Sequence, residues 1–81
     1  MNGLSVYPNP TNGKLFLTTL APIDMPLDIV VTDMNGRVMK TFNFRNLISE
    51  REFDLSDFAN GMYLFAVHTE YGSTLFKVVV K

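Results

Sequence analysis

The sequence predicts a small all-β domain, and three observations lead to that prediction. Apolar and polar residues alternate with a period of two in several short runs, as they do in half-buried strands. Gly, Pro, Asn and Asp separate these runs about every 8–12 residues. No stretch keeps a helical period of apolar residues beyond a single turn. With 81 residues, of which 47% are apolar, the chain has the composition of one folded domain rather than of a disordered chain.

We expect seven strands, at residues 4–7, 14–19, 27–33, 37–44, 50–55, 62–69 and 73–80. Their number and spacing predict a seven-stranded antiparallel immunoglobulin-like β-sandwich within a single domain, 1–81. Within most strands one row of apolar side chains is aligned on one face, and we expect these rows to form the core: Leu15, Leu17, Leu27, Ile29, Val31, Val38, Phe42, Phe44, Tyr63, Phe65, Val67, Phe76, Val78 and Val80.

The segments between the strands carry residues that favour turns. Pro8 and Pro10 end the first strand, because neither has a backbone N–H to donate to a neighbouring strand. Asn35-Gly36 suits a two-residue type I′ hairpin turn, in which both central residues have positive φ. After the fifth strand, residues 56–60 can form one helical turn with Ser56 as its N-cap. Four of the five glycines follow an asparagine, which is typical of turns.

The residues that usually carry chemistry are too few or too scattered to form a catalytic or metal site. Without cysteine the chain has no disulfide, no thiolate ligand and no Cys nucleophile. His68, the only histidine, lies in a strand pattern with no serine motif nearby, and one histidine cannot supply a usual zinc site. The aspartates lack the spacing of a calcium loop, and turns and caps explain them: Asp24, Asp28, Asp33, Asp54 and Asp57. We therefore expect no enzyme activity in this chain and no cofactor or metal.

Charge and hydropathy also restrict the partners. The net charge is −1 and the seven basic residues are dispersed, so the sequence predicts no nucleic-acid partner. The longest fully apolar run, 62–67, is far shorter than the roughly 20 residues of a membrane-spanning helix. The first residues lack the basic and apolar regions of a signal peptide. If the protein is exported, we expect the signal peptide upstream of this fragment.

Several strands are partly apolar on both faces. The residues opposite the expected core rows are Phe16, Val30, Met39, Leu64, Ala66, Leu75 and Val79. They can be ordinary scattered surface residues packed under loops. They can instead form a contact surface, including one between two copies of the chain. The sequence leaves both interpretations open.

Four short motifs follow one another along the chain: Val6-Tyr7-Pro8-Asn9-Pro10-Thr11-Asn12-Gly13; Asp33, Gly36, Arg37 and Val38; Leu55-Ser56-Asp57-Phe58-Ala59-Asn60-Gly61-Met62-Tyr63; and Lys77-Val78-Val79-Val80-Lys81. In order and spacing they resemble the C-terminal sorting domains of the type IX secretion system of Bacteroidetes. Two small departures are Val38, which follows Arg37 directly, and Phe58, where leucine is commoner. The resemblance covers nearly the whole chain.

The resemblance implies a role in export and no catalysis. In this family an upstream cargo crosses the inner membrane on an N-terminal signal peptide, and the C-terminal domain directs it across the outer membrane. A sortase-like cysteine protease then removes the domain by cleavage before it, which here means upstream of Leu4. The implied partners are the type IX outer-membrane translocon, this protease and the cargo.

The resemblance also marks the residues that the machinery would read: Val6, Tyr7, Pro8, Asn9, Pro10, Gly13, Asp33, Gly36, Arg37, Gly61, Tyr63, Lys77, Val78, Val79, Val80 and Lys81. We attribute Gly36 and Gly61 to backbone geometry rather than to direct contact. In the last strand the alternation places Leu75, Lys77, Val79 and Lys81 on the face opposite the core. If this strand lies at a sheet edge, a partner could also pair with its backbone.

Two other functions fit a domain of this kind. An adhesion or carbohydrate-binding module would need a platform of exposed aromatic side chains, for which the candidates are Phe16, Phe58 and Tyr71. A stabilising accessory domain would raise the melting temperature of an upstream enzyme.

Overall fold

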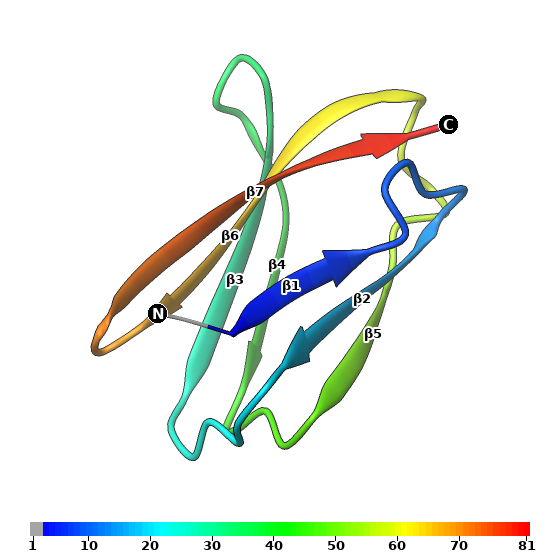
Figure 1. Ribbon diagram of the computed structural model, residues 1–81. Coiled ribbons are helices and arrows are strands. Elements are labelled where there is room, and N and C mark those ends of the chain that lie inside the picture. Colours follow the sequence, from blue (N-terminus) through cyan, green and yellow to red (C-terminus); the bar gives the residue numbers. More distant parts are fainter. Residues whose placement is uncertain (1–2) are drawn as a thin grey trace.

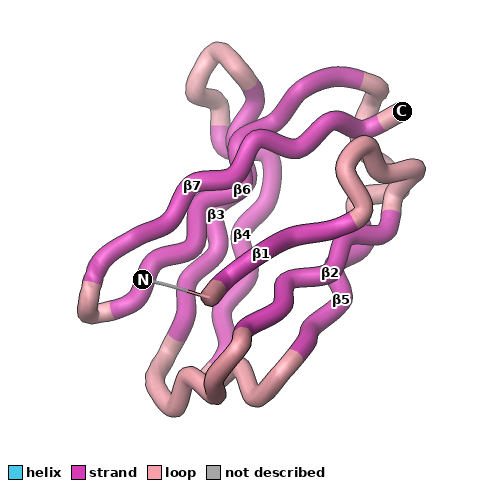
Figure 2. Tube along the Cα trace, viewed as in Figure 1, coloured by secondary structure: helices cyan, strands magenta, loops and turns pink. Residues whose placement is uncertain are grey.

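The computed structural model describes residues 3–81, which form two antiparallel sheets and no helix (Figures 1 and 2). The strands are β1 (Leu4–Tyr7), β2 (Lys14–Thr19), β3 (Leu27–Asp33), β4 (Val38–Phe44), β5 (Glu50–Asp54), β6 (Gly61–Thr69) and β7 (Gly72–Val80). Their order is β1-β2-β5 in one sheet and β4-β3-β6-β7 in the other. This confirms the predicted seven-stranded immunoglobulin-like sandwich, with four strand ends displaced by one residue.

Among the described residues no helix is long and apolar enough to cross a membrane.

The core lies between the two sheets, where alternate side chains of each strand meet. Its buried apolar residues are Leu15, Leu17, Leu27, Ile29, Val31, Leu47, Phe53, Leu55, Tyr63, Phe65, Val67, Val78 and Val80. The aromatic ring of Phe53 connects the sheets, because it packs edge-on against Phe42 at 4.8 Å and against Phe65 at 5.2 Å. Phe42, Phe44 and Phe76 are half-buried and pack against this core.

The start of β4 differs from the prediction, because a bulge interrupts its alternation. Val31 pairs with Lys40, whereas Thr32 pairs with Val38, so β4 has one extra residue at Met39. Such a bulge reverses the direction of the side chains beyond it. Val38 is therefore exposed rather than buried, and Met39 packs against the core rather than facing outward.

The β3–β4 hairpin is also not the expected type I′ turn. No residue other than glycine has positive φ among those described, so Asn35 does not adopt the conformation that type I′ requires. Instead the N–H of Gly36 donates to the carbonyl of Asp33 at 3.1 Å, and Gly36 itself has φ of 87°. This is the longer hairpin in which a left-handed glycine follows the turn.

Two further predictions about turns are wrong. Residues 56–60 form no helix: a single turn forms one residue earlier, where the N–H of Phe58 donates to the carbonyl of Leu55 at 3.0 Å. The residue that caps it is Asp54 rather than Ser56, because Oδ1 of Asp54 accepts the N–H of Ser56 at 2.9 Å. Gly61 has no positive φ, and an added Cβ would meet the Tyr63 ring only at ordinary contact distance. Backbone geometry therefore does not explain the glycine at position 61.

Candidate functional site

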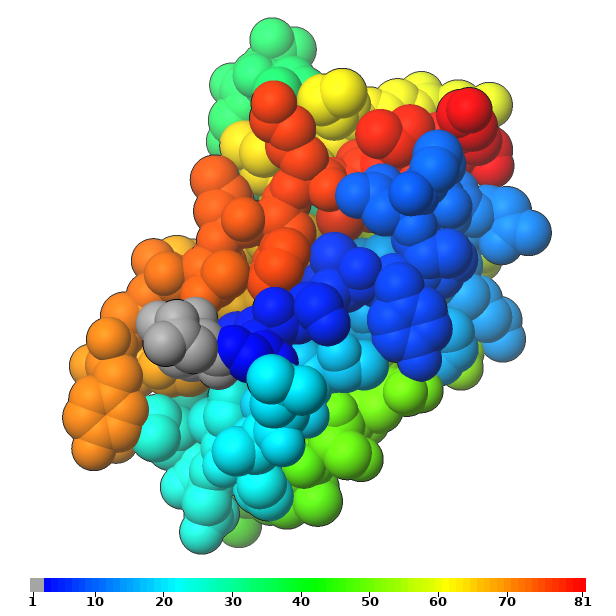
Figure 3. Space-filling view, in the orientation of Figure 1, coloured from blue at the N-terminus to red at the C-terminus, as the bar shows by residue number. Residues whose placement is uncertain are grey.

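The turn after β1 is docked on the far end of the chain. Asn9 uses its side-chain amide as a strand would use its backbone: Nδ2 donates to the carbonyl of Lys77 at 2.8 Å, and Oδ1 accepts the N–H of Val79 at 2.9 Å. These bonds join residues 68 and 70 positions apart in the sequence. Figure 3 shows the two segments, blue and red, packed together on one face of the molecule.

Thr11 continues the same contact with its backbone. Its N–H donates to the carbonyl of Val79 at 2.8 Å, and its carbonyl accepts the N–H of Lys81 at 2.9 Å. The Thr11 side chain is buried, and its hydroxyl donates to the carbonyl of Lys14 and accepts the N–H of Gly13. The backbone groups of this threonine therefore hold the turn against β7, while its hydroxyl fixes the turn itself. We call the bonds of Asn9 and Thr11 to residues 77–81 the clamp.

The clamp changes what the edge of the sheet offers to a partner. Strand β7 does lie at an edge of its sheet. However, the outward backbone groups of Lys77, Val79 and Lys81 named above already bond to Asn9 or Thr11. The expected pairing of a partner with the end of this strand would require the clamp to open. With the clamp in place, a partner can contact this end of the strand only through its side chains.

Gly13 allows the turn to approach the loop after β5. Its φ is 138°, and an added Cβ would lie 3.1 Å from the backbone Cα of Ser56. Its carbonyl accepts the N–H of Leu55 at 2.6 Å. The first sequence motif therefore packs directly on the start of the third.

The end of the third motif belongs to the core rather than to the surface. Tyr63 is buried, and its hydroxyl donates to the carbonyl of Ala59 at 2.7 Å. Phe58 packs edge-on against the Tyr63 ring, with centroids 5.0 Å apart. Together they fix the loop that precedes β6.

The terminal motif divides between the core and the surface as expected. Val78 and Val80 are buried, while Lys77 and Lys81 are exposed and Val79 is half-buried. Pro8 and Pro10, which are also exposed, lie in the turn that the clamp holds against these residues. We call the surface made of Pro8, Pro10, Lys77, Val79 and Lys81 the clamped end.

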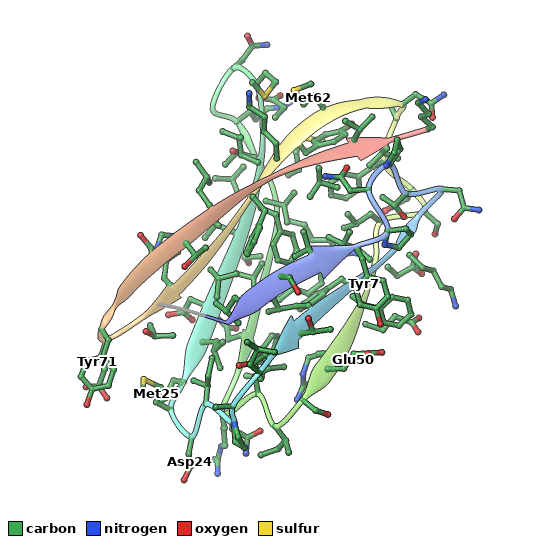
Figure 4. All side chains as sticks on the ribbon, viewed as in Figure 1. Tyr7, Asp24, Met25, Glu50, Met62 and Tyr71 are labelled. Atoms are coloured by element: carbon green, nitrogen blue, oxygen red, sulfur yellow. The ribbon has the colours of Figure 1, made fainter. Side chains whose placement is uncertain are left out.

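Val6 and Tyr7, the first two positions of the first motif, lie in β1 and outside the clamped end. Tyr7 is on the outer face of the three-stranded sheet, where its ring stacks on Phe16 at 5.3 Å and its hydroxyl donates to Glu50 at 2.8 Å (Figure 4). That hydrogen bond, followed by partial burial and the charge of Glu50, raises the pKa of Tyr7. Val6, also in β1, packs against the core.

Asp33 organises the β3–β4 hairpin, which projects beyond its sheet (Figure 1). Its Oδ1 accepts the N–H groups of Asn35 and Arg37, each at 2.9 Å, and its Oδ2 lies 3.3 Å from Nε of Arg37. The backbone N–H of Arg37 is the main cause that lowers the pKa of Asp33, with help from Asn35 and the Arg37 charge. Asp33, Gly36 and Arg37 thus serve the local turn.

Within the described residues, neither a group of metal ligands nor the expected aromatic platform is brought together. Within 3–81, no group of three or more His, Cys, Asp or Glu side chains is placed to hold a metal ion. The aromatic candidates for a sugar platform are dispersed. Phe16 stacks on Tyr7, Phe58 packs under Tyr63, and Tyr71 is exposed at the β6–β7 turn (Figure 4).

Thr11 is the residue of the site that the sequence reasoning overlooked. It stands inside the first motif, but the motif alone assigns it no role of its own. A threonine between two turn-forming pairs gives no sign that it will be buried, since its role depends on a strand nearly 70 residues away.

Comparison with known families gives a match over most of the chain. The family model for the secretion system C-terminal sorting domain matches residues 5–81. No curated protein matches the sequence. The matched range begins in β1 and includes the turn, the clamp and the whole of β7. The chain belongs to the family of C-terminal sorting domains, the signals of type IX secretion in Bacteroidetes.

Proposed function

We propose that the clamped end is the part of the signal that the export machinery recognises. The supporting observation is the clamp itself, because it joins the first and last motifs of the sequence into one surface. A surface that is already ordered loses little conformational entropy when a partner binds it. Pro8 and Pro10 add to this rigidity by fixing φ in the turn.

The route of export that we propose is the one that membership of this family implies. The chain is the C-terminal part of a larger protein, whose cargo region enters the periplasm on its own signal peptide. The type IX outer-membrane translocon binds the folded domain, and a sortase-like protease cleaves upstream of Leu4. The domain itself acts as a non-catalytic signal. A second copy of the chain remains a further expected partner.

The two exposed lysines allow a direct test. Replacing Lys77 and Lys81 by Ala removes two charges from the clamped end but none of the clamp's hydrogen bonds, which use backbone atoms of these residues. We expect surface delivery of a reporter fused ahead of the domain to fall several-fold in a type IX host, while the melting temperature of the domain changes little.

The matched control is Lys14→Ala with Arg45→Ala, which removes the same charge from exposed positions elsewhere. This control should be exported like the unaltered fusion. Normal delivery of the folded Lys77/Lys81 variant, or an equal loss in the control, would contradict recognition at the clamped end.

A further inference from the structure

The four-stranded sheet has a second face, which turns away from the core. The register aligns its side chains in rows across the strands: Val38, Thr32, Leu64 and Lys77; then Thr41, Val30, Ala66 and Leu75; then Asn43, Asp28, His68 and Ser73. Met62 and Val79 form a further pair beyond the first row. We call these residues the outer sheet face.

The outer sheet face is largely apolar, and its most exposed apolar side chains lie on the edge strands and at the start of β6. Leu75 is 61% exposed, Val38 56% and Met62 42%, which is unusual for large apolar side chains of a small domain. Val30, Leu64, Ala66 and Val79 between them are half-buried by their neighbours. The other sheet lies on the opposite side of these strands, so it does not cover this face.

The outer sheet face carries one lysine and one aspartate, which do not meet within the chain. Lys77 is in the row of Thr32, whereas Asp28 lies four residues further along β3 and two strands from β7. Strand geometry places their Cα atoms roughly 16 Å apart. Asp28 instead accepts a hydrogen bond from Nδ2 of Asn43 at 2.9 Å. In this grid of residues, Ala66 lies midway between Lys77 and Asp28.

We propose that the outer sheet face binds a second copy of the chain about a two-fold axis at Ala66. A two-fold axis in the plane of the sheet, perpendicular to the line between Lys77 and Asp28, exchanges their positions. Each lysine then faces the other copy's aspartate, which gives two complementary charge pairs in one dimer. Closed two-fold dimers use the same patch on both copies in this way.

The size and chemistry of the face fit a second copy. The face spans five residues of β3, 28–32, and seven of β6, 62–68, so its footprint over the four strands is at most about 20 Å by 20 Å. This area, about 400 Å², is smaller than the roughly 800 Å² per partner of a standard interface and fits a weak one. The apolar centre is bordered at one end by Asn43, His68 and Ser73, which resembles the polar rim of such interfaces. We expect weak pairing, with a dissociation constant on the order of 100 μM.

Pairing also bears on recognition, because Lys77 and Val79 belong to both the outer sheet face and the clamped end. Two paired copies would cover these residues. Recognition of the clamped end would therefore require the monomer, although the dimer itself does not depend on that proposal. The two can be tested separately, one by export and the other by mass in solution.

Sedimentation equilibrium of the 81-residue chain, from about 10 μM to about 2 mM, should show a monomer–dimer equilibrium. We expect Lys77→Glu and Asp28→Lys each to raise the dissociation constant about tenfold, since each sets like charges against each other twice. The double variant, with the charges swapped, should restore the dimer. Because the two residues are too far apart to interact within one chain, such a rescue must occur between copies.

A second variant tests the position of the axis. Ala66→Glu places two carboxylates against each other at the centre and should abolish pairing, whereas Ile48→Glu, at an exposed apolar position outside the face, should not. Thermal unfolding checks that each variant is folded. If the wild type stays monomeric over the whole concentration range, the outer sheet face does not bind a second copy and the proposal is wrong. So would a swapped variant that does not recover pairing, or an Ile48→Glu variant as impaired as Ala66→Glu.

Discussion

At the scale of single residues, Gly13 and Asn9 of the first turn each have a structural role that depends on their particular chemistry. Gly13 combines a positive φ with a close approach to Ser56, so both its backbone conformation and its lack of Cβ matter. Asn9 offers a donor and an acceptor at the spacing of a peptide group. Both residues act on the contact between the turn and segments far away in sequence.

Gly72 makes it possible to separate the two requirements at Gly13. The φ angles are nearly equal, 138° at Gly13 and 136° at Gly72, but an added Cβ at Gly72 meets nothing within 4 Å. We expect Gly72→Ala to lower the free energy of unfolding by about 1–2 kcal/mol, from backbone strain alone. Gly13→Ala should cost about 1 kcal/mol more, because Ser56 must move. Urea denaturation measures both, and equal costs would show that the close approach does not matter.

How much of the site the sequence could predict is clearest at these residues. Pro8, Pro10 and Gly13 predict a turn because of their backbone preferences, and the structure has a turn there. Local chemistry cannot show where the Asn9 amide finds its partners, because Lys77 and Val79 come close only after both sheets have assembled. For the same reason the burial of Thr11 could not be predicted, because it depends on contact with the end of β7.

At the scale of elements, the strands were predictable because each has its own alternation, whereas their irregularities were not. The alternation in the sequence predicts that Phe42 and Phe44 share one face. No residue in the sequence predicts the bulge at Met39, which turns the Val38 side chain to the opposite face. The β3–β4 hairpin shows a second case. Asn35-Gly36 favours one turn type, yet Asp33 binds two N–H groups of the loop and stabilises a longer one.

The hairpin should make stability depend on acid pH through Asp33. Its pKa is lowered from 3.8 in the folded state, so the unfolded chain takes up a proton first as the pH falls. The stabilisation from its carboxylate is therefore complete above the unfolded pKa and is lost as the pH drops through the lowered folded pKa. We expect the melting temperature of the wild type to fall more steeply below about pH 4 than that of Asp33→Asn.

Melting curves from about pH 5 to about pH 2.5 test this dependence. Asp54→Asn should flatten the curve in the same sense, because the hydroxyl and N–H of Ser56 lower the pKa of Asp54. Asp57→Asn controls for the removal of an exposed carboxylate in the same region. Parallel curves for the wild type and Asp33→Asn would contradict the role given to the hairpin.

At the scale of the whole molecule, the clamp connects the two sheets at one end of the sandwich. The first turn leaves β1 in the three-stranded sheet and bonds to β7 at the edge of the four-stranded sheet. Edge strands usually expose a row of backbone groups that invite pairing with other chains. Here the last part of that row is occupied by Asn9 and Thr11, so the C-terminal residues are held although nothing follows them in the described chain.

Hydrogen exchange of β7 amides should reveal this protection. The N–H groups of Val79 and Leu75 point to the same outer edge, because residues of one parity face the same way along a strand. Only Val79 has Asn9 as an acceptor, so we expect its amide to exchange at least about tenfold more slowly than that of Leu75.

Asn9→Ala should abolish the difference, whereas Asn9→Asp keeps an oxygen for Val79 and should preserve most of it. The Lys81 amide, which bonds to Thr11, reports whether the turn stays in place in each variant. If Val79 exchanges as fast as Leu75 in the wild type, or is unaffected by Asn9→Ala, the clamp does not hold the end of the chain in solution.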